Sequence, residues 1–259
     1  MIRLAVLGPS GRMGRLVIEL VGDHCDPDTA IVSAVDAPDS PLIGREVVPG
    51  VVVTSDLDAG LTRADVYIDF TTPESTRLAA QAARAHRVAG VIGTTGLDPA
   101  TDRAIDELAT HAPVVVAANF SLGVNVLSGL VKRAARALGP EFDLEIVEIH
   151  HKHKRDAPSG TALALAESLV AGRGTSLRNR PTREGDVGAR SPDEIGVMAV
   201  RGGDVAGEHT VYFLGPNERL ELTHRSGSRR IFAQGALHAA RWVAGQPAGR
   251  YDMNHVLDL

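Results

Sequence analysis

The residues with the clearest capacity for chemistry lie in one segment near the middle of the sequence. Residues 150–154 read His-His-Lys-His-Lys, and residues 156–161 read Asp-Ala-Pro-Ser-Gly-Thr. Imidazole titrates near neutral pH and can deliver a proton during a reaction, while a lysine ammonium can pair with an anion. The segment therefore predicts a site that combines proton transfer with anion binding.

Three interpretations of this segment compete. Three histidines could hold zinc, but their close spacing does not match the usual zinc motifs and no further ligand group stands out. A solvated basic loop would have the same composition. A site at the start of a helix accounts for more of the residues, because a helical pattern over 161–170 follows Pro-Ser-Gly. We favour this third interpretation and expect no metal.

A helix start can bind an anion through its backbone. The N–H groups of Gly160 and Thr161, together with the Thr161 hydroxyl, would hold a carboxylate. Lys154 would add a positive charge, and one of His150 and His151 would deliver a proton while the other binds the substrate. A reductase needs such a proton, because hydride addition leaves negative charge on the acceptor.

A second motif lies near the start of the chain, where Gly8, Gly11 and Gly14 follow an apolar run and open a helical pattern. Glycines at these places allow a tight turn and a close approach to a pyrophosphate, which the amino end of a helix attracts. The spacing is GxxGxxG rather than GxGxxG, so a simple strand-to-helix turn is the alternative. The context favours a dinucleotide site formed by Gly8, Pro9, Ser10, Gly11, Arg12, Met13 and Gly14.

An acidic residue follows the second predicted strand. Asp36 lies about 20 residues after the glycine loop, where a carboxylate accepts hydrogen bonds from the adenosine ribose and repels a 2'-phosphate. The next residue is Ala37 rather than an arginine, so we expect NADH to be preferred over NADPH unless Arg12 or Arg15 compensates. The alternative is that Asp36 only begins a turn.

Alternating strand and helix patterns would position these residues in the first part of the chain. This alternation predicts a doubly wound parallel sheet whose functional loops lie at the carboxyl ends of the strands. The strand-like runs are residues 2–7, 31–35, 64–70, 89–96 and 113–118, and the helical patterns are 13–21 and 74–86.

The pattern changes after Ser121, which predicts a second domain with an open, largely antiparallel sheet. Residues 178–192 are rich in Arg, Gly and Pro and predict a long loop. The pattern alone does not establish whether the helix expected near the C-terminus returns to the first domain. The expected helices are 124–138, 161–170 and 232–243, and the expected strands are 142–149, 195–201, 208–214 and 219–224.

The composition is that of an ordinary folded chain. Its 259 residues suffice for two domains, and its hydrophobic (44%) and charged (23%) fractions exclude disordered and collagen-like classes. The net charge of -5 and the dispersed basic residues argue against a nucleic-acid partner. The single cysteine, Cys25, excludes an internal disulfide and is expected to be a buried hydrophobe. With no membrane span or cleavage site visible, we expect a cytoplasmic protein.

The motifs together resemble one family, the dihydrodipicolinate (4-hydroxy-tetrahydrodipicolinate) reductases of diaminopimelate and lysine biosynthesis. The resemblance spans nearly the whole chain and is most specific in the histidine and lysine segment. It implies reduction of 4-hydroxy-tetrahydrodipicolinate, a small cyclic dicarboxylate, to tetrahydrodipicolinate by NAD(P)H, with loss of water. The residues that carry it are 8–14, 93–96, 119–121, 150–161, 183–185, 207–210 and 256–259.

The resemblance also implies a fold and an assembly. The fold is α/β: a Rossmann-like domain of residues 1–121, joined by 229–259, and an α+β substrate and tetramerisation domain of residues 122–228 with an open mixed sheet. The assembly is a homotetramer joined through those sheets.

The resemblance assigns roles by matched position. His150 is the implied proton donor, Lys154 the second acid and charge partner, and His151, Gly160 and Thr161 the substrate binders. Two departures from the family pattern are Ala118, where many relatives have proline, and Ala37, which replaces the arginine of NADPH-tolerant members. The implied cofactor contacts beyond the glycine loop and Asp36 are Phe70, Gly93, Thr94, Thr95, Ala117, Ala118, Asn119, Phe120, Arg229 and Phe232.

Two rival functions stay open from the sequence. Another two-domain NAD(P) reductase, such as an aspartate or homoserine dehydrogenase, would share the glycine loop but has no need of residues 150–154. A nonenzymatic NADH-sensing module would bind the dinucleotide and a partner, and it gives no reason for a histidine pair beside a helix start.

Overall fold

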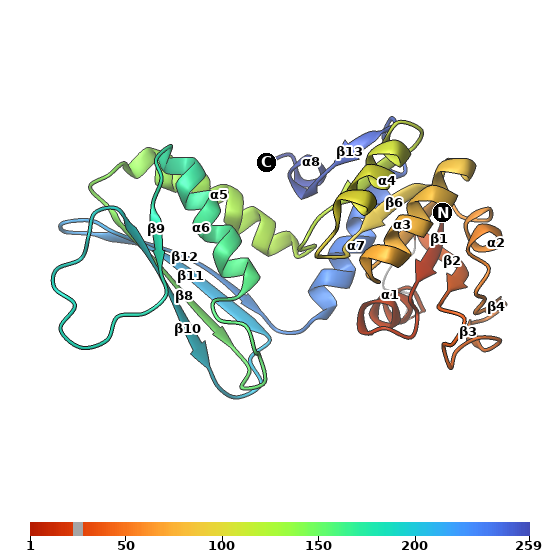
Figure 1. The fold of residues 1–259 in the computed structure, drawn as a ribbon, viewed down its shortest axis with the longest axis horizontal. Coiled ribbons are helices and arrows are strands. Elements are labelled where there is room, and N and C mark those ends of the chain that lie inside the picture. The colour runs from red at the N-terminus through yellow and green to blue at the C-terminus, as the bar shows by residue number, and fades with distance from the viewer. Residues whose placement is uncertain (23–27) are drawn as a thin grey trace. The chain divides into compact units, whose positions relative to one another are not determined.

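The computed structural model of the chain describes residues 1–22 and 28–259. The chain divides into two compact units (Figure 1). Unit 1 comprises Met1–Leu122 and Arg230–Asp258, and unit 2 comprises Gly123–Arg229 and Leu259. The predicted burial of Cys25 lies outside the described residues.

Unit 1 is built on a six-stranded sheet in the order β13-β7-β6-β5-β1-β2, in which every neighbouring pair is parallel. The predicted doubly wound parallel sheet is therefore confirmed. The strands are β1 (Ile2–Leu7), β2 (Thr29–Val35), β5 (Val66–Asp69), β6 (Ala89–Ile92), β7 (Pro113–Val116) and β13 (Gly249–Tyr251), with a separate antiparallel pair, β3 (Glu46–Val48) and β4 (Val51–Val52). The helices are α1 (Arg12–Gly22), α2 (Leu57–Leu61), α3 (Pro73–His86), α4 (Pro99–Ala109), α7 (Arg230–Val243) and α8 (Met253–Leu257).

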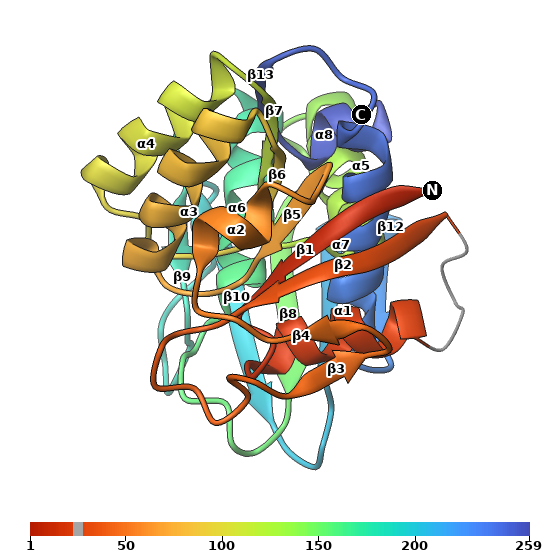
Figure 2. The same cartoon turned by 90° about the vertical axis from the view of Figure 1, so that its right-hand side faces the viewer.

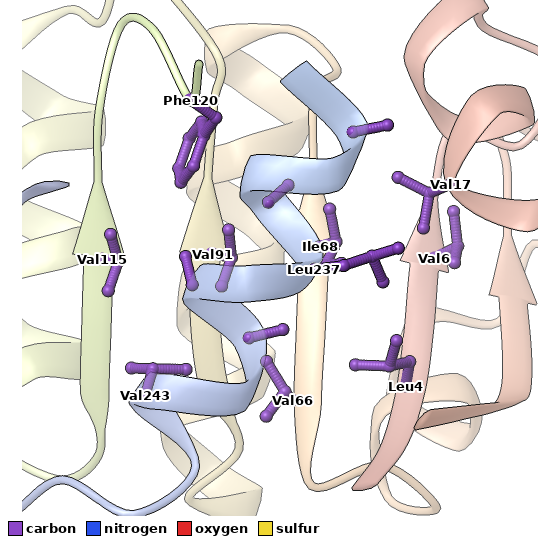
Figure 3. Packing of buried hydrophobic residues seen from close by; sticks show 14 of the residues in the cluster. Leu4, Val6, Val17, Val66, Ile68, Val91, Val115, Phe120, Leu237 and Val243 are labelled. Carbon is purple, nitrogen blue, oxygen red and sulfur yellow. The ribbon is translucent and has the colours of Figure 1, made fainter. Parts of the chain in front are cut away.

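Helices cover both faces of this sheet (Figure 2). Successive side chains of a strand point to opposite faces, so Leu4 and Val6 of β1 join a core with α1 and α7, while Ala5 and Leu7 join a core with α3 and α4. Helix α7, from near the C-terminus, lies along β1, β5, β6 and β7 (Figure 3). A strand buried on both faces in this way explains why the strand sequences are almost continuously apolar.

Unit 2 holds a five-stranded sheet in the order β12-β11-β8-β10-β9. Strands β8, β10 and β9 are parallel, whereas β11 is antiparallel to β8 and β12. The open mixed sheet is confirmed, and the expectation of a largely antiparallel sheet was wrong: helix α6 is a crossover between β8 and β9, and a long loop then returns the chain to β10 between them, so all three strands are parallel. The elements are β8 (Asp143–His150), β9 (Arg178–Arg180), β10 (Glu194–Arg201), β11 (Gly207–Leu214), β12 (Arg219–Ser226), α5 (Leu122–Leu138) and α6 (Gly160–Arg173).

Helices α5 and α6 pack on one face of this second sheet (Figure 1). Leu144 and Ile146 of β8 are buried beneath them, and the alternation along the strand carries Glu148 and His150 on the same face. The opposite face has no helix packed on it among the residues that the structure describes. The end of β8 thus delivers two polar side chains to the helix-covered side.

Candidate active site

His150 is the last residue of β8, and its side chain is 8% exposed. Its Nδ1 atom lies 2.6 Å from Oε2 of Glu148, two residues earlier on the same strand face. Glu148 is fully buried. An imidazole bonded to a buried carboxylate in this way is held in one orientation, which leaves Nε2 as its other polar atom.

The Glu148 carboxylate is held by further donors. Arg201 of β10, which lies opposite His150 in the strand register, donates to both carboxylate oxygens at 2.7 Å. The backbone N–H of Ser159 donates to Oε1 at 3.0 Å. Burial alone would raise the pKa of Glu148, but these bonds outweigh it and hold the pKa below its ordinary value. The carboxylate is therefore ionised at neutral pH.

Ser159 joins this carboxylate to helix α6. Its side chain accepts a hydrogen bond from the N–H of Ala162, so Ser159 is the N-cap of α6. Its Oγ also lies 3.1 Å from Nε2 of His209. Gly160 is exposed and Thr161 half-buried at the first turn, so the positive end of the helix dipole lies beside the His150 cluster.

A second imidazole packs against the first. The rings of His209 and His150 meet edge to face with centroids 5.2 Å apart. Burial, followed by the nearby His150, lowers the pKa of His209 to about 4, so this side chain is neutral at pH 7. A Cβ atom at Gly207 would lie 3.0 Å from Nε2 of His150, so glycine at that position leaves this nitrogen uncovered.

The remaining predicted residues of the segment lie in the loop after β8. His151 is half-buried, and its pKa is lowered by burial and by the charge of Arg229. Lys154 pairs with Asp156 at 2.9 Å, and its charge acts on both His151 and His209. His153 is exposed. The structure thus places His150, His151 and Lys154 at one end of the sheet of unit 2, beside the amino end of α6.

In unit 1 the predicted dinucleotide loop connects β1 to α1. Gly8 has a φ of +68°, a left-handed conformation that favours glycine. A Cβ at Gly14 would lie 2.2 Å from the carbonyl oxygen of Gly8, so only glycine lets α1 pack this closely on the loop. The side chain of Arg12 is exposed at the start of α1. A strand, a tight loop and a helix start arranged in this way fit a diphosphate.

Asp36 directly follows β2, next to the glycine loop. One carboxylate oxygen accepts bonds from the Ser10 N–H at 3.0 Å and the Ser40 hydroxyl at 2.8 Å, and the other accepts from the Ala37 N–H. Burial would raise the pKa of Asp36, but these bonds lower it below its ordinary value. An ionised carboxylate at this edge of the sheet fits a ribose diol.

The loops after β5, β6 and β7 meet at the same edge. The rings of Phe70 and Phe120 meet edge to face with centroids 5.6 Å apart. A Cβ at Gly93 would lie 2.0 Å from the Phe70 ring. The Thr94 side chain is buried and accepts a bond from the Thr76 hydroxyl at 2.8 Å, so it faces into the unit. Other predicted contacts near these loops are exposed or half-buried: Thr95, Ala117, Ala118, Asn119 and, on α7, Phe232.

The sequence predicted no role for four residues around His150: Glu148 bonds its Nδ1, Ser159 and Arg201 bond Glu148, and His209 packs against its ring. Glu148 could have been found, because a residue two positions before His150 on a strand shares its face. Arg201 and His209 lie on other strands, and only the strand pairing brings them to this place.

No helix in residues 1–22 and 28–259 is both long and apolar enough to cross a bilayer. Over those same residues, no group of three or more His, Cys, Asp or Glu side chains has an arrangement that could hold a metal ion.

Comparison with known proteins gives one consistent result. The protein-family model "Dihydrodipicolinate reductase, N-terminus" matches residues 2–120, and the family model "Dihydrodipicolinate reductase, C-terminus" matches residues 123–257. The chain is 47% identical over 266 residues to the 4-hydroxy-tetrahydrodipicolinate reductase of Alkalilimnicola ehrlichii, covering 99% of each chain. It is 48% identical over 268 residues to that of Anaeromyxobacter dehalogenans strain 2CP-1, covering 100% of this chain and 98% of that one.

A solved structure agrees with these matches. The chain is similar to dipicolinate-bound dihydrodipicolinate reductase from Paenisporosarcina sp. TG-14, with a TM-score of 0.80, 26% identity and 97% of each chain covered.

Proposed function

The chain belongs to the dihydrodipicolinate reductase family, and we propose that His150 is the acid that completes its reduction of 4-hydroxy-tetrahydrodipicolinate to tetrahydrodipicolinate. The observation that supports this role is the buried Glu148–His150 pair beside the amino end of α6. The reaction takes up one hydride and one proton and releases one water.

Substrate binding falls to the residues around this pair. A dicarboxylate carries two negative charges, and the dipole of α6 at Gly160 and Thr161 attracts one of them. The ammonium of Lys154 adds a full positive charge, and His151 adds a further polar contact. Binding next to His150 then brings the ring of the substrate within reach of Nε2.

The proton step uses the free nitrogen of His150. Protonated at Nε2, His150 donates that proton to the substrate as negative charge builds up on the ring, so the N–H bond breaks and a bond to the substrate forms. Glu148 stays ionised and stabilises the imidazolium before transfer. Solvent afterwards restores the proton at Nε2. Lys154 balances the substrate charge and is the proposed second acid.

We propose that unit 1 binds the nicotinamide dinucleotide, which supplies the hydride when it is bound. The loop of residues 8–14 would hold the diphosphate and Asp36 the adenosine ribose. The loops at 93–95 and 117–120, with Phe70, Phe232 and Arg229, would surround the nicotinamide. The boundaries of the two units fall at Leu122/Gly123 and Arg229/Arg230. In this proposal unit 1 binds the dinucleotide and unit 2 binds the substrate.

We propose that NADH is preferred over NADPH. The ionised Asp36 repels a 2'-phosphate, and the neighbouring Ala37 offers it no positive charge. Side-by-side titrations of the two cofactors should give tighter binding of NADH. Equal affinity for both would contradict this preference.

We propose that the chain assembles as a homotetramer through the sheet of unit 2 and works in the cytoplasm. The sheet face away from α5 and α6 carries half-buried Val147, Ile149 and Met198 and exposed Val200. An apolar sheet face of this kind suits contact with another copy of itself.

An absorbance assay tests the reaction. NADH would be mixed with the enzyme and freshly made 4-hydroxy-tetrahydrodipicolinate, while NAD+ would be mixed with aspartate or homoserine in parallel. We expect the absorbance to fall in the first mixture and not to rise in the other two. Turnover of aspartate or homoserine alone would favour the other reductases, and no turnover with any substrate would favour a sensing module.

A further inference from the structure

We propose that Glu148 is a positioning residue of this reaction: together with Arg201 it fixes the tautomer of His150, so that Nδ1 always carries a proton and Nε2 is the atom that exchanges one with the substrate. This inference rests on the proposed role of His150 and goes beyond it by naming the group that prepares that side chain.

The hydrogen-bonding capacity of the Glu148 carboxylate decides which nitrogen of His150 carries a proton. An ionised carboxylate has no proton to give and can only accept. The Ser159 N–H and the two Arg201 N–H groups are donors that cannot become acceptors, and all of them point at Glu148. His150 is the remaining partner, at 2.6 Å. Its Nδ1 must therefore be the donor, which makes Nε2 the nitrogen available for chemistry.

The carboxylate is also held in place from several elements. Arg201 comes from β10, and its guanidinium donates further to the carbonyl oxygens of Asp156 and Val200. Ser159 is the N-cap of α6. Because Glu148 is fully buried and bonded from three sides, it has little freedom to move. The start of α6 therefore fixes the position of the His150 imidazole through the side chain of Glu148.

Electrostatics adds a second effect to the geometry. Besides His150, the charged group that acts on Glu148 is Arg201 on β10, while His224 on β12 and Lys154 in the loop act on the neighbouring His209 of β11. His209 is neutral at pH 7, burial lowers the pKa of His224, and Arg201 and Lys154 are positive, so Glu148 is the negative charge hydrogen-bonded to His150. A carboxylate within hydrogen-bond distance attracts the charged form of an imidazole.

The variant Glu148→Gln separates these effects from a merely structural role. A glutamine keeps the size of the side chain but offers one acceptor and one donor group. If its oxygen faces Ser159, its NH2 group faces Nδ1 of His150 and favours the opposite tautomer. Histidine labelled with 15N shows the tautomer directly by two-bond NMR correlations, in the wild type and in the variant.

We expect the wild type to show His150 protonated at Nδ1. In Glu148→Gln we expect kcat to fall about 100-fold, as when a general acid is misplaced, while KM and the NADH Kd change little. The loss of kcat towards high pH should begin at lower pH than in the wild type. Glu148→Asp, which keeps the charge, should recover part of kcat and the original tautomer.

Glu145 provides a matched control. It lies on the same strand, on the opposite face, and is bonded by Arg183 and Arg190 much as Glu148 is bonded by Arg201. Glu145→Gln removes a comparable ion pair on the other face of the sheet, so the His150 tautomer and the pH at which kcat falls should not change.

The outcomes distinguish this inference from the proposed function. His150 protonated at Nε2 in the neutral wild-type enzyme would overturn the inference without any variant. An unchanged kcat and pH profile in a folded Glu148→Gln enzyme would overturn it as well, while an inactive His150→Asn enzyme would leave the proposed function standing. Normal turnover in His150→Asn would instead remove the proposed function.

Discussion

At the scale of single residues, the chemistry depends on which buried groups carry charge at neutral pH. Glu148 is ionised because Arg201, His150 and the Ser159 N–H bind it, although it is fully buried. His209 is neutral because burial outweighs every attraction for a proton. The ionised Glu148 beside the His150 imidazole is an arrangement suited to the transfer of one proton.

The depressed pKa of His209 predicts a loss of stability in acid. The folded value of about 4 lies below the unfolded value of 6.5, so the unfolded chain binds the proton more readily and stability falls as pH drops through this window. When the pH falls from 7.5 to 5, protonation of this residue in the unfolded chain should lower the free energy of unfolding by about 2 kcal/mol. Urea unfolding of the wild type and of His209→Gln at both pH values measures it, because the variant lacks this titration. An equal loss in both proteins would contradict the prediction.

The sequence pointed to the proposed reacting residues better than to the residues that hold them. His150, His151 and Lys154 stand out because histidines and lysines cluster within five positions, and a cluster is visible without a fold. Arg201, in contrast, cannot be recognised from the sequence, because it reaches Glu148 only when β10 pairs with β8. Supporting groups that come from distant strands depend on pairing, which a single sequence does not specify.

At the scale of elements, each site is built at an element end. The glycine loop joins the end of β1 to the start of α1, and the His150 cluster joins the end of β8 to the start of α6. Helix starts expose N–H groups, and strand ends project side chains beside them. The proposed function thus gives the two units the same local geometry for binding two different anions.

The variant Gly14→Ala tests the packing of the first of these junctions. Its added methyl group would lie 2.2 Å from the carbonyl oxygen of Gly8, and such overpacking should cost about 1–3 kcal/mol of unfolding free energy. NADH binding should weaken as well, since the loop must shift. Gly22→Ala is the control: it lies in the same helix and its Cβ would meet nothing within 4 Å. Thermal unfolding and NADH titration of both variants would show a difference, and equal behaviour would contradict the packing argument.

Elements with strong patterns were predictable, and those held by distant pairing were not. The apolar runs of β1 and β8 match the structure closely. Helix α4 was missed although its signal was present, because Asp98 caps it, Pro99 begins it and Ile105 and Leu108 share its buried face. Strand β13 has only three residues, and its pairing with β7 defines it.

At the scale of the whole molecule, the chain returns to its first unit after building the second. Helix α7 fills the core of unit 1 with Leu237 and Val243 (Figure 3), so the first sheet is complete only when the C-terminal part of the chain has folded. This dependence on distant contacts predicts slow folding of unit 1 relative to a purely local unit.

The proposed tetramer makes a prediction at this scale. Light scattering should give the wild type four times the mass of one chain. Val200→Glu places a charge on the open sheet face of unit 2, where Val200 is 46% exposed, and should produce smaller species. Leu78→Glu, on α3 of unit 1 with similar exposure, should leave the mass unchanged. A monomeric wild type, or a tetrameric Val200→Glu protein, would contradict the proposed interface.

The most direct test of the account is the turnover of His150→Asn with 4-hydroxy-tetrahydrodipicolinate and NADH. The variant keeps a polar side chain but loses the proton at Nε2, so kcat should fall by about 10²–10⁴-fold. The NADH Kd, measured in the same preparation, should stay within a small factor of the wild-type value, because the proposed dinucleotide site lies in unit 1. Near-normal turnover with intact NADH binding would contradict the assignment of His150 as the acid.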